Sequence, residues 1–286
     1  MKIAVFGANG LVGSHAVRYF SEIGHKVITV NHSSGKADYF ADASDLNSVR
    51  SILHESKPDV VFNAVKSSLS TDASEFRKPE TWQSNVIVPQ TLALVSSELR
   101  IKFVHLSSAW VYEGLAGVVY SENSITYPLN FYSYSKAIAE ERVASCCRNS
   151  IILRADSVFG IDSRGANFFS RLKISQEEHK EFHASKDQIC QPIYAGEISR
   201  LTEALLNAGS TGIFNCVSPD LVSRYDFALR ICKAFDFDRD LVIPAISSVR
   251  AIRIPENLKL DIQKINSVCK VKPLDSQIKD LRELLQ

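Results

Sequence analysis

The sequence predicts an α/β protein with a Rossmann-type, doubly wound parallel sheet and a smaller C-terminal substrate-binding lobe. Three observations predict this fold. Short apolar runs alternate with stretches of helical periodicity in the first half of the 286-residue chain, a glycine-rich turn follows the first apolar run, and the alternation loosens after Arg154. Strands that alternate with helices form βαβ units, whose right-handed crossovers place helices on both faces of a parallel sheet.

The predicted elements follow one another in order along the chain. Each strand is a short apolar run, and each helix repeats apolar residues at a spacing of three and four. The predicted strands are Ile3–Phe6, Val27–Val30, a short one near Tyr39–Ala41, Val60–Phe62, Phe103–Leu106, Ile151–Leu153 and Ile213–Cys216. The predicted helices are Leu11–Ile23, Leu46–Leu53, Trp82–Leu99, Phe131–Cys147, Phe168–Gln176, Ala195–Leu206, Arg224–Phe235 and Ser276–Leu285.

The loosened alternation predicts two lobes that interleave in the sequence. We expect residues 1–155 to form a dinucleotide-binding Rossmann domain that residues 188–216 rejoin. We expect residues 156–187 and 217–286 to form the substrate-binding lobe. A length of 286 residues suits one large domain or one and a half.

The composition argues against several classes of function. The 33 basic and 32 acidic residues leave a net charge of +1, so no basic footprint for nucleic acid is expected. No apolar run reaches the length of a membrane span, and the first residues lead into an apolar strand without a secretory signal pattern. The six cysteines show no metal-ligand spacing, and the adjacent Cys146 and Cys147 are expected to be helix-face thiols. We therefore expect a cytoplasmic protein without a metal, a nucleic acid or a membrane as partner.

A glycine-rich turn joins the first predicted strand to the first predicted helix. Gly7, Gly10 and Gly13 form the pattern GxxGxxG. The first glycine allows a tight turn, the second lets the backbone approach a pyrophosphate, and the third lets the helix pack closely on the strand. The N–H groups of the helix N-terminus then face the phosphates. We therefore predict that this turn binds NADP(H) or NAD(H), with contributions from Asn9, Leu11 and Val12.

The residues after the second strand favour NADP(H) over NAD(H) by a modest margin. NAD-selective proteins place an acidic residue there to bind the ribose hydroxyls, but this chain has no carboxylate before Asp38. Asn31, Ser33 and Ser34 can donate hydrogen bonds to a 2′-phosphate, and Lys36 supplies positive charge. The alternative is a polar loop that contacts no phosphate, so NAD(H) stays open as the cofactor.

A second motif lies at the start of the helix before the strand Ile151–Leu153. Tyr132 and Lys136 form YxxxK, and residues four apart lie on one helix face. The Lys136 ammonium is expected to lower the pKa of the Tyr132 phenol and to hold a ribose hydroxyl of the cofactor. Ser108 follows the predicted strand Phe103–Leu106, at the edge where open α/β sheets bind ligands. We predict that Ser108, Tyr132 and Lys136 are catalytic, with ordinary turn chemistry as the alternative for the serine.

With these motifs in this order, the chain resembles the extended short-chain dehydrogenase/reductases over its full length. Within that superfamily it is most similar to the dTDP-4-dehydrorhamnose reductase family. The segments that carry the resemblance are 59–64, Asn85, 106–108, 111–114, 153–154, 158–160, 167–168, 187–189, 192–195, 223–228, 253–255, 260–261 and Lys264.

The resemblance implies reduction of a nucleotide-linked keto-sugar by hydride from NADPH. Tyr132 would donate the proton to the sugar oxygen and Ser108 would hold that oxygen. The family pattern implies that Asn63, Ala64 and Val65 line the nicotinamide side and that Asp42 lies near the adenine. It also implies a substrate site that includes Lys66, Ser108, Trp110, Asn167 and Arg253, with Arg250 in the same covering stretch.

Several departures from the family pattern leave the sugar open. Ala109 and Trp110 replace the family's aspartate and tyrosine, Ser157 lies where a tryptophan is usual, and Lys66 follows Asn63 in a longer loop. Dehydratases of the superfamily carry an aspartate and a glutamate directly after the serine or threonine. Ala109 and Trp110 occupy these two places here, so dehydration is disfavoured. Two alternative functions stay open: an NAD-dependent nucleotide-sugar epimerase and a non-catalytic NADP-binding regulatory subunit. A homodimer is also open as the oligomeric state.

Overall fold

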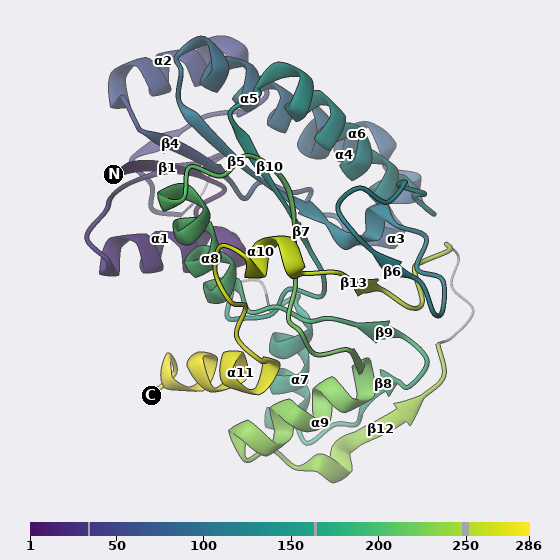
Figure 1. Ribbon diagram of the computed structural model, residues 1–286. Coiled ribbons are helices and arrows are strands. Elements are labelled where there is room, and N and C mark those ends of the chain that lie inside the picture. The colour runs from purple at the N-terminus through teal and green to yellow at the C-terminus, as the bar shows by residue number, and fades with distance from the viewer. Residues whose placement is uncertain (34, 163–164, 248–251) are drawn as a thin grey trace.

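The computed structural model describes residues 1–33, 35–162, 165–247 and 252–286. Its centre is a parallel sheet of seven strands in the order β10-β7-β5-β4-β1-β2-β3 (Figure 1). The chain winds outward from β1 to β3, crosses back to β4, and then winds outward to β10. The direction of winding therefore reverses between β1 and β4, and ligands of such sheets bind at the carboxyl ends of the strands beside this switch point.

The bounds of the elements are as follows. The main sheet consists of β1 (Lys2–Phe6), β2 (Lys26–Asn31), β3 (Tyr39–Phe40), β4 (Val60–Asn63), β5 (Lys102–Ser108), β7 (Ser150–Ala155) and β10 (Gly212–Cys216). Three strand pairs lie outside it among the described residues: β6 (Val119–Tyr120) with β13 (Lys259–Leu260), β8 (Phe182–Ser185) with β12 (Val242–Ala245), and β9 (Ile189–Cys190) with β11 (Val222–Ser223). The α-helices are α1 (Leu11–Glu22), α2 (Leu46–Ser56), α3 (Thr71–Phe76), α4 (Lys78–Trp82), α5 (Val88–Glu98), α6 (Phe131–Cys146), α7 (Phe168–Glu177), α8 (Ala195–Asn207), α9 (Arg224–Phe235), α10 (Gln263–Asn266) and α11 (Leu274–Glu283). A π-helical turn, η1 (Gln83–Ile87), and two 3₁₀ turns, η2 (Ala109–Val111) and η3 (Arg239–Leu241), complete the described elements.

Helices cover both faces of the sheet because its strands are apolar on both sides. All six residues of β7 and all four of β4 are buried. One face packs on α1 and α8 through a core that includes Phe20, Phe62 and Leu201. The other face packs on α2, α5 and α6 through a core that includes Leu92 and Phe103. Burial on both faces is the ordinary condition of parallel sheets, and the predicted fold class is confirmed.

The predicted helix Trp82–Leu99 is wrong in its first part. The helical course begins earlier, at Lys78, and passes through the π-helical turn before α5 continues it. The turn places Asn85 inward, where it is buried and hydrogen bonds to Ser67 and Ser135. Single π-turns of this kind occur where a helix must aim one side chain, and the sequence period gives no sign of them.

The later part of the chain builds a second core beside the sheet. Phe159 and Phe168 each pack against Phe227, with ring centroids 5.2 and 5.0 Å from it. Within the expected return segment 188–216, β10 pairs with β7 in the main sheet, whereas β9 pairs with β11 outside it. The division of the chain into two lobes itself remains a prediction.

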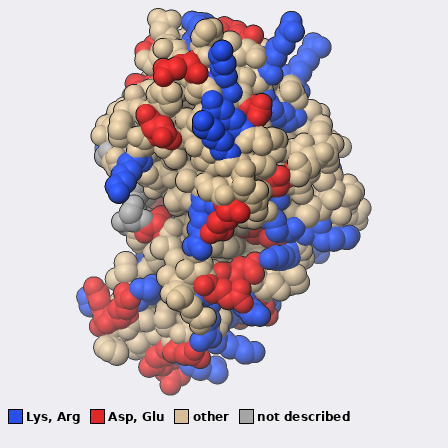
Figure 2. All heavy atoms as spheres, turned by 90° about the vertical axis from the view of Figure 1, so that its left-hand side faces the viewer, with Lys and Arg blue, Asp and Glu red and all other residues tan. Residues whose placement is uncertain are grey.

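Figure 2 shows the face that lies on the left-hand side of Figure 1, and positive and negative side chains are interspersed over it. Neither sign forms a continuous patch on that face. No helix among the described residues is long and apolar enough to cross a membrane.

Candidate active site

The glycine turn after β1 is closed by contacts that leave no room for side chains. Gly7 has φ +77°, and its carbonyl accepts a hydrogen bond from the N–H of Gly10 at 2.9 Å. A Cβ atom on Gly13 would lie 2.1 Å from the Gly7 oxygen. Helix α1 begins after Gly10, which has no side chain to cap it. The first N–H groups of α1 therefore lie open beside the turn, as a pyrophosphate requires.

The loop after β2 is tied to this glycine turn. The Asn31 side chain accepts a hydrogen bond from the Asn9 N–H at 3.2 Å and donates one to the Lys36 carbonyl at 3.4 Å. Gly35 has φ +84°, and a Cβ there would lie 2.0 Å from the Asn9 amide nitrogen. Asn31 is buried and fixes the two loops, Ser33 is exposed, and Ser34 lies outside the described residues.

A cavity of about 450 Å³ lies between these loops and α1. Its walls are formed by Ala8, Asn9, Ser14, Val17, Thr29, Lys36, Ala37 and Asp38. The Asp38 carboxylate is already bound, because it accepts hydrogen bonds of 2.8 Å from the N–H and the hydroxyl of Thr29. Lys36 is thus the candidate cofactor residue of this loop that lines the cavity. Asp42 lies further on, where it accepts hydrogen bonds from the Ser44 N–H and hydroxyl.

The three candidate catalytic residues come together at the carboxyl end of β5. Ser108 ends that strand, and a hydrogen bond joins its side chain to Tyr132 on the first turn of α6. Lys136 lies one turn further along α6, and its Nζ donates to the Leu106 carbonyl at 2.7 Å. The Trp110 ring meets the Tyr132 ring edge-on, with centroids 6.3 Å apart. The three residues that the sequence spacing predicted to lie together therefore do lie together in the structure.

Burial controls the protonation of this cluster. The expectation that Lys136 lowers the pKa of Tyr132 is wrong for this structure: desolvation raises that pKa, a hydrogen bond with Ser108 opposes the rise, and Asp156 adds to it. Desolvation also lowers the pKa of Lys136 to about 8, with Glu140 opposing this effect and Lys66 reinforcing it. At neutral pH the phenol is therefore protonated and most of the lysine is charged.

The carboxyl end of β4 brings a second set of predicted residues beside Gly7. The Asn63 amide oxygen accepts from the Val65 N–H at 3.0 Å, and its nitrogen lies 3.1 Å from His105 Nδ1. The backbone of Ala64 is so close to Gly7 that a Cβ there would lie 3.1 Å from its carbonyl carbon. Asn63, Ala64 and Val65 thus lie at the switch point, where the resemblance places the nicotinamide.

The remaining predicted substrate residues are spread around the cluster. Lys66 follows β4 and is close enough to Lys136 to affect its pKa. The Arg253 carbonyl accepts a hydrogen bond from Asn130, which caps α6 two residues before Tyr132, so this stretch lies on the side of Tyr132. The Asn167 amide caps α7 and hydrogen bonds to Ser170 with both of its polar atoms. Arg250 lies outside the described residues.

Two buried acids near the cluster were missed in the sequence. Asp156 follows Ala155, the register partner of Ser108, and it is 2% exposed. Its carboxylate accepts from the Gln191 N–H at 3.0 Å, and burial raises its pKa. Glu140 lies on α6, four residues after Lys136, and it is also buried. The i, i+4 spacing after Lys136 could have identified Glu140 from the sequence, whereas no sequence pattern marks Asp156.

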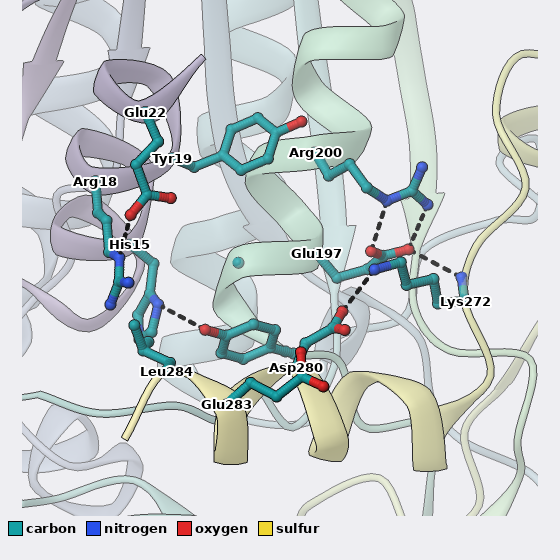
Figure 3. A pocket seen from close by; sticks show the side chains of 12 residues that line it. His15, Arg18, Tyr19, Glu22, Glu197, Arg200, Lys272, Asp280, Glu283 and Leu284 are labelled. Carbon is teal, nitrogen blue, oxygen red and sulfur yellow. Dashed lines mark hydrogen bonds and ion pairs between the residues drawn. The ribbon is translucent and has the colours of Figure 1, made fainter. Parts of the chain in front are cut away.

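A separate cavity of about 300 Å³ lies between α1, α8 and α11 (Figure 3). Paired charges line it, including Arg18 with Glu22 and Arg200 with Glu197. The candidate catalytic residues are not among its lining residues, so it is not the reaction site. His15 closes one side: its Nε2 accepts from the Ile161 N–H at 3.2 Å, and its Nδ1 lies 3.2 Å from the Tyr194 hydroxyl.

Because His15 is buried, we expect the contact between α1 and the loop after β7 to be sensitive to acid. Desolvation lowers the pKa of His15 from 6.5 to about 4. The unfolded chain therefore takes up the proton first, so this contribution to stability is present above pH 6.5 and is lost as the pH falls toward 4. Between pH 7 and pH 5 the free energy of unfolding should fall by about 2 kcal/mol more in the wild type than in His15→Gln. Urea unfolding at both pH values measures this difference.

The exposed His54 provides the control for this measurement. His54→Gln should keep the wild-type dependence on pH, since this side chain lies in solvent on the surface of α2. Equal acid sensitivity of His15→Gln and the wild type would contradict the assigned protonation of His15.

Comparison with known proteins decides the family. A family model described as the RmlD substrate binding domain matches residues 1–286. The chain belongs to this family. It is 28% identical over 272 residues to a probable low-salt glycan biosynthesis reductase of Haloferax volcanii, covering 91% of this chain and 90% of that protein. It is 27% identical over 298 residues to a dTDP-4-dehydrorhamnose reductase of Aggregatibacter actinomycetemcomitans, covering 98% of each.

Solved structures agree with the fold of this RmlD-family chain. The dTDP-4-dehydrorhamnose reductase of Bacillus anthracis, solved in complex with NADP, aligns over 99% of both chains with a TM-score of 0.89 and 18% identity. The resemblance inferred from the sequence motifs is therefore confirmed at the level of family and fold.

Proposed function

We propose that this chain is an NAD(P)H-dependent reductase of a nucleotide-linked keto-sugar. The observation that carries the proposal is the cluster of Ser108, Tyr132 and Lys136 at the carboxyl end of the sheet, beside an open glycine turn. A protonated tyrosine, a hydroxyl next to it and a charged lysine are the groups that reduction of a carbonyl requires. The reductase names of the two relatives support the same reaction.

The side chains divide the work of the reaction among them. The dinucleotide, when bound, supplies a hydride to the carbonyl carbon. Ser108 holds the carbonyl oxygen, and Tyr132 gives its phenol proton to that oxygen as negative charge develops there. The raised pKa of Tyr132 keeps the proton available at neutral pH. The Lys136 ammonium would hold a ribose hydroxyl of the dinucleotide, and solvent then reprotonates the phenolate.

The glycine turn fits a dinucleotide, and the loop after β2 favours NADPH. Leu11, Val12 and Gly13 would offer backbone N–H groups to the pyrophosphate, and Asn9 and Gly10 would lie against it. The cavity beside Lys36 would take the 2′-phosphate, with Ser33 and Ser34 at the same loop and Asp42 near the adenine. The NADP bound by the Bacillus anthracis relative supports this choice.

Lys36 gives a direct test of cofactor choice. Asn31→Asp would reverse the preference by charge repulsion, but it would also break the hydrogen bond to the Lys36 carbonyl. Lys36→Glu places the negative charge in the cavity and leaves that bond intact. We expect it to lower kcat/KM for NADPH by about 10-fold or more, with little change for NADH. Steady-state kinetics with both cofactors measures the ratio.

Lys26 is the matched control for this charge reversal. It is exposed at the opposite end of β2, and Lys26→Glu should leave the cofactor ratio unchanged. An unchanged ratio in Lys36→Glu would remove the loop after β2 from the cofactor site.

We assign the sugar nucleotide to the space between the cluster and the later part of the chain. Trp110 and Lys66 would border the sugar, because one meets Tyr132 edge-on and the other lies near Lys136. Arg253 would contact a phosphate or the sugar from the stretch bound to Asn130. Asn167 would contribute from the start of α7. In this division residues 1–155 and part of 188–216 bind the dinucleotide, and the remainder binds the substrate.

A panel of dTDP-, UDP- and GDP-linked keto-sugars tests the reaction. Consumption of NADPH with formation of one sugar alcohol is the expected result. Interconversion of sugar epimers with catalytic NAD would instead identify an epimerase. Stoichiometric co-purification with an enzyme that the chain activates, without turnover of its own, would identify a regulatory subunit.

We further propose a cytoplasmic enzyme that forms a homodimer. All six cysteines are free thiols, which suits a reducing compartment. Light scattering in solution measures the mass, and a monomer would contradict the second part of this proposal.

A further inference from the structure

Helix α6 presents three side chains to the last residues of β5, at intervals of four along one face. Tyr132 contacts the final residue of the strand. Lys136 donates to the Leu106 carbonyl at 2.7 Å, and Glu140 accepts from the Ser107 hydroxyl at 2.5 Å. Three successive strand residues thus meet three helix side chains one turn apart. Glu140 continues the row formed by the two catalytic side chains.

A second strand immobilises the Glu140 carboxylate. The Arg154 guanidinium on β7 binds both of its oxygens, with nitrogen–oxygen distances of 2.6 to 3.1 Å. The two side chains are 4% and 5% exposed. Arg154 also donates to the Tyr112 hydroxyl and to the Glu122 carbonyl. A carboxylate with this many charge-assisted partners is held in one position.

The groups that face Lys136 differ in their effect on its charge. Lys66, from the loop after β4, repels the ammonium. His105 on β5 is uncharged, because burial lowers its pKa well below the ordinary value. Tyr132 on the same helix is protonated at neutral pH. Glu140 is the acid that attracts the ammonium, and it opposes a desolvation that brings the pKa of Lys136 to about 8.

We propose that Glu140 is a positioning residue: its fixed carboxylate, one turn further along the same face of α6, holds the Lys136 ammonium charged. The inference rests on the proposed function for its catalytic consequence, but the charge relation between the two side chains does not depend on any substrate. Without the carboxylate, burial and Lys66 would act on the lysine unopposed. The lysine would then be neutral near the pH at which the enzyme has to work.

The decisive change is Glu140→Gln, which removes the charge and keeps the size of the side chain. The titration of Lys136 is followed by NMR in the full-length protein carrying ¹³C-labelled lysine, with Lys136→Met to assign the signal. We expect its midpoint to move down by about one to two pH units. The alkaline limb of NADPH affinity, measured by fluorescence without sugar, should move by a similar amount.

Glu141→Gln is the matched control, because Glu141 is the next residue of α6 and is exposed. It should leave the lysine titration and the alkaline limb where they are. Glu140→Asp, which retains the charge, should keep the lysine titration near the wild-type midpoint. Glu140→Gln with Arg154→Met removes both buried charges, so that folding does not depend on an unpaired guanidinium. The titration should again move down in this double variant.

The outcomes separate a charge role from a packing role. A uniform loss of affinity or stability in Glu140→Gln, with the lysine titration unmoved, would overturn the proposal. Failure to reduce any keto-sugar would count against the proposed function alone, because the lysine titration needs neither turnover nor cofactor.

Discussion

Tyr132→Phe is expected to lower kcat by about 100- to 10,000-fold while leaving NADPH affinity within a few-fold of the wild type. The substitution removes the phenol proton and keeps the ring, which packs edge-on against Trp110. The hydroxyl touches the reacting carbonyl oxygen in the proposed reaction, so its loss affects the chemical step and not the binding of the dinucleotide. Single-turnover kinetics with NADPH, and fluorescence titration of NADPH, separate the two effects.

Tyr134→Phe is the control on the same helix. Tyr134 is 45% exposed and packs beside Phe131 and Trp82, away from Ser108. It should retain wild-type turnover. A Tyr132→Phe enzyme with near-normal kcat would show that another group donates the proton.

Gly13→Ala is expected to have the second large effect, on both stability and cofactor binding. Its Cβ would lie 2.1 Å from the Gly7 oxygen and 2.8 Å from the Gly7 carbonyl carbon, and these backbone atoms cannot turn aside. Helix α1 would have to move away from β1, which should lower the free energy of unfolding by about 2 to 4 kcal/mol. The same movement displaces the N–H groups that would bind the pyrophosphate, so NADPH affinity should fall by about 10-fold or more.

Gly10→Ala separates these two consequences. Gly10 has φ −77°, and its Cβ would lie 3.2 Å from the Gly7 oxygen. Its stability should change by less than about 1 kcal/mol, whereas the pyrophosphate would still meet the added methyl group. Denaturant unfolding and NADPH titration of both variants provide the measurement. Wild-type values of both quantities in Gly13→Ala would exclude the assigned role of the glycine turn.

Local sequence signals were sufficient for the fold and for the grouping of the candidate catalytic residues. The positions of Gly7 and Gly13 after an apolar run report a backbone conformation and a close approach that other residues cannot meet. Tyr132 and Lys136 share a helix face by spacing alone. Ser108 needed only the rule that ligands bind where parallel strands end. These inferences succeeded because each rests on the geometry of a single element or of one strand–helix connection.

The sequence by itself therefore determined the α/β class, the glycine turn and the Ser–Tyr–Lys cluster. Only the tertiary structure decided the charges around that cluster. Asp156 and Glu140 act on Tyr132 and Lys136 because β7 lies beside β5 and α6 packs against β5, and burial there removes the water that would screen them. The effect of Asp156 depends on contact between elements far apart in the chain, and both effects depend on desolvation, which no residue pattern encodes.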